Sequence, residues 1–244
     1  MGQAGARLCA GLDDCRVTIG PDTTTLPPGL PDQVAPPGVR SLEVRWIFPG
    51  PLNTAVAGWF ERFPAAMESR DDAYLLSPQL RGLSVKLRAG ETLDVKVYHG
   101  SPGILDVAGQ ARGRLQSWQK WSFPGDLLSQ ESGNPAGWRP VGKTRRISRF
   151  SRASGQVLAR GPRLAKEPRC AVELTEIRTR GEAWWSLGFE ATGPVGLLGD
   201  ELEATASLVF AEPLPRGVKP STDDSRSYAE WLGQWPNADG DTSP

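Results

Sequence analysis

Apolar and polar side chains alternate along several short segments of this 244-residue chain. In residues 41–48, for example, Leu42, Val44 and Trp46 alternate with Glu43 and Arg45. Such alternation is typical of β-strands, because successive side chains of a strand point to opposite faces of the sheet. The same pattern predicts further strands at residues 73–76, 83–88, 93–98, 112–123, 138–150, 170–177, 183–191 and 201–211.

Two segments carry the signals of helices instead. Asn53 is a favourable N-cap for residues 54–63, in which apolar residues recur at helical spacing. Residues 223–232 form a second amphipathic segment, with Tyr228, Trp231 and Leu232 expected to face inward. Because short strands dominate and strands do not alternate with helices, the expected fold class is mostly β (α+β), an antiparallel sheet or barrel with a few flanking helices.

The ends of the chain differ in composition from its middle. Prolines recur between Pro27 and Pro37, so residues 1–39 are expected to form an irregular leader. Residues 40–212 are expected to form the folded domain, and residues 213–244 a linker, a helix and a polar tail. The leader and the C-terminal helix are the places where a protein partner could bind.

Overall composition excludes several classes of protein. The formal net charge is zero, which does not favour duplex nucleic acid or an anionic membrane as a partner. The three cysteines, Cys9, Cys15 and Cys170, have no paired metal-ligand spacing and suggest reduced thiols. No apolar run reaches the roughly 20 residues that span a bilayer. We therefore expect a cytoplasmic protein, in which the single histidine, His99, lies in an exposed turn.

The polar faces of the predicted strands carry charges two residues apart. Lys86 and Arg88 share one such face, and Lys143 and Arg145 share another. An open sheet with one solvated face gives this alternation. A closed barrel gives it too, with a polar lumen and an apolar outer wall covered by the two helices. Because cations in such a lumen repel one another, they would require an anionic ligand or carboxylates to compensate them.

The order of these strands resembles the CYTH superfamily, the triphosphate tunnel metalloenzymes. Ser41–Arg45 (SLEVR) is similar to the family's first E-x-E-x-K strand, and Val85–Arg88 and Leu93–Lys96 to its next two basic strands. Lys143–Arg145, Ala171–Glu173 and Gly188–Glu190 are similar to its later K-x-R, single-carboxylate and E-x-E strands. The resemblance implies an eight-stranded antiparallel tunnel in which basic residues bind a triphosphate and glutamates hold Mg²⁺ or Mn²⁺.

The resemblance and, for Trp118, the parity of its strand suggest roles for three groups of residues. The phosphate-binding group comprises Arg45, Lys86, Arg88, Lys96, Lys120, Lys143 and Arg145, for which exposed sheet charges are the alternative. Glu43, Glu173 and Glu190 are the metal ligands, or else structural partners of the lumen cations. Trp118 either stacks on an organic group of the ligand or packs at one end of the tunnel.

The carboxylates of the family pattern are incomplete here, because Ser41, Gln116, Trp118 and Gly188 stand in their places. We therefore expect binding of a triphosphate-containing compound, nucleotide or polyphosphate more than its hydrolysis, which would be the work of a metal-dependent triphosphatase holding one ion. The alternative from another class is a non-catalytic sensor or adaptor. A cyclase, which the resemblance also includes, is disfavoured by the sparse carboxylates.

Overall fold

The computed structural model describes residues 38–80, 82–125, 137–151, 156–158 and 168–234. The predicted leader, apart from Gly38 and Val39, and the polar tail beyond Gln234 lie outside the described residues, as do Cys9 and Cys15. Among the described helices, none has the length and apolarity needed to cross a membrane.

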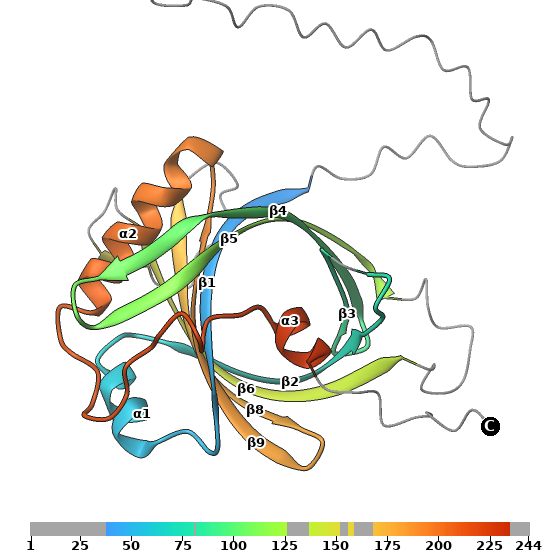
Figure 1. Ribbon diagram of the computed structural model, residues 1–244, viewed down its shortest axis with the longest axis horizontal. Helices are drawn as coiled ribbons and strands as arrows, with labels where there is room; N and C mark the ends of the chain where they lie inside the picture. Colours follow the sequence, from blue (N-terminus) through green and yellow to red (C-terminus); the bar gives the residue numbers. More distant parts are fainter. Residues whose placement is uncertain (1–37, 81, 126–136, 152–155, 159–167, 235–244) are drawn as a thin grey trace, which may run out of the picture. The chain divides into compact units, whose positions relative to one another are not determined.

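The described strands form a closed, eight-stranded antiparallel barrel (Figure 1). Around the barrel the order is β2-β3-β4-β5-β1-β9-β8-β6, and pairing of β2 with β6 closes it. The short strand β7 (Gln156–Leu158) adds to the edge of β6. The barrel strands are β1 (Val39–Pro49), β2 (Ala66–Leu75), β3 (Leu83–Arg88), β4 (Thr92–Val107), β5 (Ala111–Pro124), β6 (Trp138–Ser151), β8 (Arg169–Thr179) and β9 (Glu182–Thr192). The predicted fold class is confirmed.

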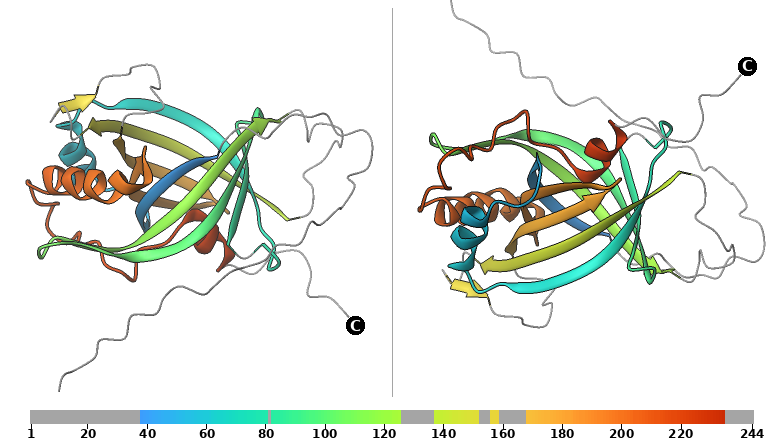
Figure 2. Two further views of the ribbon diagram at one scale, coloured as in Figure 1. Left: turned by 90° about the horizontal axis from the view of Figure 1, so that it is seen from above. Right: turned by 90° about the horizontal axis from the view of Figure 1, so that it is seen from below.

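The main hydrophobic core lies outside the barrel wall rather than within it. Helices α1 (Thr54–Glu61) and α2 (Leu198–Val209, after the 3₁₀ turn η2, Val195–Leu197) lie together at one end of the barrel (Figure 2). Trp46 of β1 and Phe189 of β9 are buried against Phe210, which follows α2. Burial of each such side chain is worth about 1.5–3 kcal/mol. The apolar faces of β1 and β9 therefore pack outside the barrel wall, and their polar faces line its interior.

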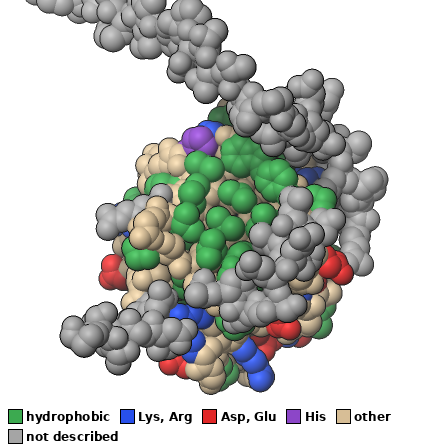
Figure 3. Space-filling view, turned by 90° about the vertical axis from the view of Figure 1, so that its right-hand side faces the viewer, with side chains coloured by type: hydrophobic (Ala, Val, Ile, Leu, Met, Phe, Trp, Pro, Cys, Tyr) green, Lys and Arg blue, Asp and Glu red, His purple; other side chains and the backbone are tan. Residues whose placement is uncertain are grey.

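The helices cover only part of the outer wall, unlike the prediction. Helix α2 packs against β1, β8 and β9. On the side that carries β3, hydrophobic side chains gather at the surface (Figure 3). The outward side chains of this strand, Leu83, Val85 and Leu87, are only partly buried. The apolar face of β3 is thus not part of the helix-covered core.

Four predicted elements differ from the structure. Residues 201–211 are not a strand: Leu198, Leu202, Ala206 and Val209 recur at helical spacing and are buried on one face of α2. Strand β2 begins at Ala66, seven residues before the predicted strand. The sequence did not reveal this part because Ser69 and Asp71 make the outward face polar as well, so that apolar and polar residues do not alternate.

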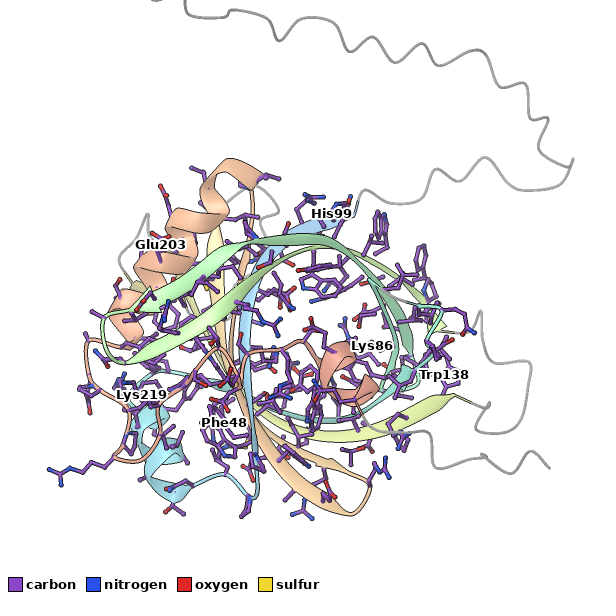
Figure 4. All side chains as sticks on the ribbon, viewed as in Figure 1. Phe48, Lys86, His99, Trp138, Glu203 and Lys219 are labelled. Atoms are coloured by element: carbon purple, nitrogen blue, oxygen red, sulfur yellow. The ribbon has the colours of Figure 1, made fainter. Side chains whose placement is uncertain are left out.

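Strand β4 also continues beyond its predicted end, through two register irregularities near Gly100 and Gly103. His99 is exposed, as expected, but it lies within this strand rather than in a turn (Figure 4). The predicted C-terminal helix exists as α3 (Tyr228–Gly233) and begins five residues later than expected. Ser227 and Glu230 form a capping box that fixes its first turn. Trp231 and Leu232 are buried, as predicted.

Candidate functional site

The barrel interior contains a polar cavity of about 310 Å³. Among the described residues, nine lysine or arginine side chains and five carboxylates line it, an excess of four positive charges. All the residues predicted to bind phosphate or metal line this cavity, and so does Trp118. The structure therefore places the predicted residues on one surface, and their roles stay predictions. The charged lining residues are Glu43, Arg45, Glu68, Arg70, Lys86, Arg88, Asp94, Lys96, Lys120, Lys143, Arg145, Arg149, Glu173 and Glu190.

Asp72 is the most buried carboxylate beside the cavity and joins three cations. Its Oδ2 atom accepts a hydrogen bond from Lys143 Nζ at 2.8 Å and lies 3.5 Å from Lys86 Nζ. Its Oδ1 atom lies 3.0 Å from Arg70 Nε. The side chains of Asp72 and Lys143 are 0% and 2% exposed. This cluster holds three positive charges on β2, β3 and β6 around one carboxylate.

Asp94 forms a second, neighbouring cluster on β4. It forms ion pairs with Arg88 and with Lys86, whose Nζ lies 3.7 Å from Oδ2. Ser122 donates a hydrogen bond to its Oδ1 atom at 2.6 Å. Sequence reasoning missed Asp94 and Asp72 as site residues. The signal for Asp94 was its position on the same strand face as Lys96.

Glu173, a predicted metal ligand, is instead enclosed by arginines. Arg45 Nη1 donates to Glu173 Oε1 at 3.2 Å, Arg145 forms an ion pair with Oε2, and Thr175 Oγ1 donates to Oε1 at 2.7 Å. Burial raises the pKa of Glu173, but Arg145 and Arg45 outweigh burial and hold the pKa well below its ordinary value. This carboxylate is therefore a buried counter-ion for two guanidinium groups.

Arg45 lies over the backbone of Gly188, on the neighbouring strand β9. A Cβ atom at Gly188 would lie 2.8 Å from Arg45 Cζ and 3.0 Å from Nη1, so a side chain there would require the guanidinium group to move. The two residues are register partners between β1 and β9. The guanidinium group thus occupies the space of the carboxylate that the CYTH pattern places at position 188.

Glu43 and Glu190 are also register partners between β1 and β9. Lys96 Nζ lies 2.6 Å from Glu43 Oε1 and 3.6 Å from Glu190 Oε1. Ser41 Oγ donates a second hydrogen bond to Glu43 Oε1 at 2.6 Å. Lys96 lowers the pKa of Glu190 to about 2. Burial lowers the pKa of Lys96, but Glu190 and Glu43 outweigh burial and hold the pKa above its ordinary value.

The pKa values of Lys86, Lys143 and Lys120 are lowered, whereas that of Lys96 is raised. Burial lowers the pKa of Lys86 to about 8 despite the nearby Asp72 and Asp94 carboxylates. Burial and the neighbouring Lys86 charge hold the pKa of Lys143 well below its ordinary value. Burial also lowers the pKa of Lys120, which has no ion-pair partner within 4.0 Å among the described residues. More negative charge near these lysines would favour their protonated forms.

Helix α3 contributes an aromatic side chain to the same cavity. The Tyr228 ring lies 3.9 Å from Lys143 Nζ and 4.8 Å from Arg45 Cζ, measured to the ring centroid. Tyr74 Oη also lies 2.7 Å from Lys143 Nζ, at hydrogen-bond distance. Sequence analysis placed Tyr228 on the inner face of a helix but did not connect it with the tunnel. The C-terminal segment is therefore part of the candidate site.

Trp118 lies between the polar cavity and a second, more apolar pocket of about 640 Å³. It is 4% exposed, and its ring centroid is 5.0 Å from that of Tyr98. The second pocket is bordered by apolar side chains such as Leu76, Leu80 and Leu83 and by residues of α3. Trp118 thus packs between strands and also forms one wall of a space beside the cationic cavity.

The carboxylates do not fit a resident metal ion. Among residues 38–234 that the structure describes, no group of three Asp, Glu, His or Cys side chains is arranged to hold a metal. Glu173 forms ion pairs with two arginines, Arg45 and Arg145. The Lys96 ammonium group lies where a cation shared by Glu43 and Glu190 would bind. A divalent ion would need at least one of these pairs to open.

Comparisons with known proteins give a distant structural likeness. No family model matches the sequence, and no curated protein matches it. A conserved hypothetical protein from Pyrococcus furiosus matches with 15% identity and a TM-score of 0.38, over 77% of this chain and 98% of its own. The PH1819 protein from Pyrococcus horikoshii matches with 15% identity and a TM-score of 0.39, over 80% and 98%.

Proposed function

We propose that the tunnel binds a triphosphate-containing compound or polyphosphate. The observation that supports the proposal is the formal excess of basic side chains around the cavity: nine lysine or arginine side chains against five lining carboxylates and the buried Asp72 behind them. Buried cations persist when opposite charges and hydrogen bonds compensate them. Carboxylates compensate only part of the charge in this cavity, and a phosphate chain supplies both the missing negative charge and many acceptor oxygens.

The neighbouring apolar pocket supports a ligand with an organic group. A phosphate chain in the polar cavity would place such a group beside Trp118 and Tyr98. Aromatic side chains favour flat, apolar groups through stacking contacts worth about 0.5–1.5 kcal/mol. A nucleotide is therefore expected to bind more tightly than inorganic tripolyphosphate, and Trp118 is proposed as the stacking residue.

Isothermal titration calorimetry with tripolyphosphate, ATP and polyphosphate, each in EDTA and in Mg²⁺, tests the proposal. Lys86→Met is the test variant, because Lys86 lies inside the barrel and lines the cavity. Lys219→Met is the control, because Lys219 lies outside the barrel (Figure 4). A hydrogen bond to a charged group is worth about 1.5–3 kcal/mol, so Lys86→Met should weaken binding roughly tenfold to hundredfold. Absence of binding for all three anions in both conditions would refute the proposal.

The alternative function is a sensor or adaptor with the same anion site. The contact of α3 with the cavity favours it, because Ser227 and Tyr228 border the space that the ligand would fill. Ligand binding would then protect the amides of α3 from hydrogen exchange and change how this segment contacts a protein partner. Metal-dependent phosphate release that Glu190→Gln abolishes would exclude a purely non-catalytic role.

A further inference from the structure

Three carboxylates of the tunnel already have cationic partners within the chain. Lys96 Nζ lies within 3.6 Å of both Glu43 and Glu190, which face each other on paired strands. The side chains of Lys96 and Glu43 are 19% and 15% exposed. Water therefore screens this contact little, and the ammonium group is held by opposite charges on two sides.

Arg45 is the second cation that contacts a predicted metal ligand, Glu173. Its guanidinium group lies against Gly188 and donates to Glu173 and to Ser186 Oγ, the latter at 3.1 Å. A carboxylate side chain at position 188 is excluded as long as Arg45 stays there. Gly188 thus removes one possible metal ligand and also leaves the space that the Arg45 guanidinium group occupies.

We propose that the Lys96 ammonium and the Arg45 guanidinium groups are built-in cations that take the place of a divalent metal, so that the tunnel binds its phosphate anion without one. This inference rests on the proposed function for the identity of the anion. It departs from the magnesium or manganese dependence that the sequence resemblance implies.

Electrostatics supports this substitution of protein cations for a metal. An ammonium group and a divalent ion a few ångströms apart repel each other by several times the thermal energy. Displacing Lys96 would also leave a buried charge without its partner, which is strongly unfavourable. Mn²⁺ therefore has to compete with a cation that is covalently attached to the barrel.

Mn²⁺ binding measured by electron paramagnetic resonance, without phosphate, tests the position of Lys96. Lys96→Met removes the charge and keeps the length of the side chain, and Lys96→Arg keeps the charge. We expect Lys96→Met to bind Mn²⁺ roughly tenfold or more tightly than the wild type, because the repulsion is gone. Lys96→Arg should behave as the wild type does. Adding Glu190→Gln to Lys96→Met should remove the gained site.

The second measurement is titration of wild-type protein with tripolyphosphate in EDTA. Binding in EDTA supports the inference. Tripolyphosphate binding that requires Mg²⁺ or Mn²⁺ overturns the inference and leaves the proposed anion binding intact. Equal Mn²⁺ affinity of the wild type and Lys96→Met also overturns the inference without affecting the proposed anion binding. If tripolyphosphate binds in neither condition, the proposed function fails, and with it the claim of metal-free anion binding. If Lys96→Met does not fold, the EDTA titration of the wild type decides alone.

Discussion

Replacing Asp72 by asparagine removes one negative charge from the most buried ion cluster of the barrel and keeps the shape of the side chain. Lys143, Lys86 and Arg70 then share the neighbourhood without their common carboxylate. Lys86 retains Asp94 and Arg70 retains Glu68, but Lys143 has no other ion-pair partner within 4.0 Å among the described residues. The main cost should therefore come from Lys143.

Removing one partner of a buried ion pair typically costs about 3–5 kcal/mol. This value is the upper limit here: the Asp72 and Lys143 side chains are almost inaccessible to water, but Lys143 can release its proton once its carboxylate partner is gone. For a domain of this size, each kilocalorie lowers the melting temperature by about 2–4 °C, so we expect a decrease of up to roughly 6–20 °C.

The cost should decrease as the pH rises. The pKa values of Lys86 and Lys143 are already below the ordinary value because of burial, and loss of Asp72 lowers them further. Between these lowered values and the unfolded-state value of about 10.4, the folded variant binds fewer protons than the unfolded chain. Stability then rises with pH in this window, and it rises more steeply for the variant than for the wild type.

Urea unfolding of the wild type and of Asp72→Asn at pH 7 and pH 9 measures both effects. Glu68→Gln is the matched control, because Glu68 also pairs with two cations but its side chain is 38% exposed. Its replacement should cost less than about 1 kcal/mol. A cost for Asp72→Asn as small as that of the control, or one that does not change with pH, would refute the buried cluster as described.

Three further predictions follow from the same contacts. Tripolyphosphate affinity, measured by calorimetry, should increase as the pH falls from 9 to 7, because Lys86 with its pKa of about 8 gains a proton that the anion favours; affinity independent of pH would contradict this. Gly188→Ala should cost about 1–3 kcal/mol in urea unfolding, because its Cβ atom would displace Arg45, and Gly58→Ala in α1, with open space around it, is the control. Ser227→Ala should cost about 1 kcal/mol and speed hydrogen exchange of α3 through loss of its cap, and unchanged exchange would argue against that capping role.

The arrangement of charges explains how a barrel of this size can have a polar interior. Carboxylates hold the lysines and arginines apart and orient them: Asp72, Asp94 and Glu173 are each shared by two or three cations. Glu43 and Glu190 instead share one cation, Lys96. The apolar free energy of folding comes from outside the wall, where Trp46 and Phe189 pack beneath the helices. The apolar core and the charged cavity therefore lie on opposite faces of the same strands.

The sequence by itself determined which face of most strands is polar, because side-chain alternation is a local property of the chain. The parity of Lys86, Lys96 and Lys143 placed them correctly in the barrel interior. Strand β2 escaped this reasoning: its outward face carries Ser69 and Asp71 as well, so it lacks the apolar alternation that marks a half-buried strand. Asp72, which pairs with three cations, lies on this strand and was missed for the same reason.

Only the tertiary structure decided which charges meet. Glu43 and Lys96 are 53 residues apart in the sequence, and Arg45 and Glu173 are 128 apart. Strand order brings both pairs together, because β4 and β8 each lie one strand away from β1. Barrel closure, through the pairing of β2 with β6, brings Asp72 to Lys143 in the same way. Alternation gives the direction of each side chain but not its neighbours, because neighbours depend on strand order and register. The sequence could therefore nominate Glu43, Glu173 and Glu190 as metal ligands, and only the fold shows the cations that already occupy their oxygens.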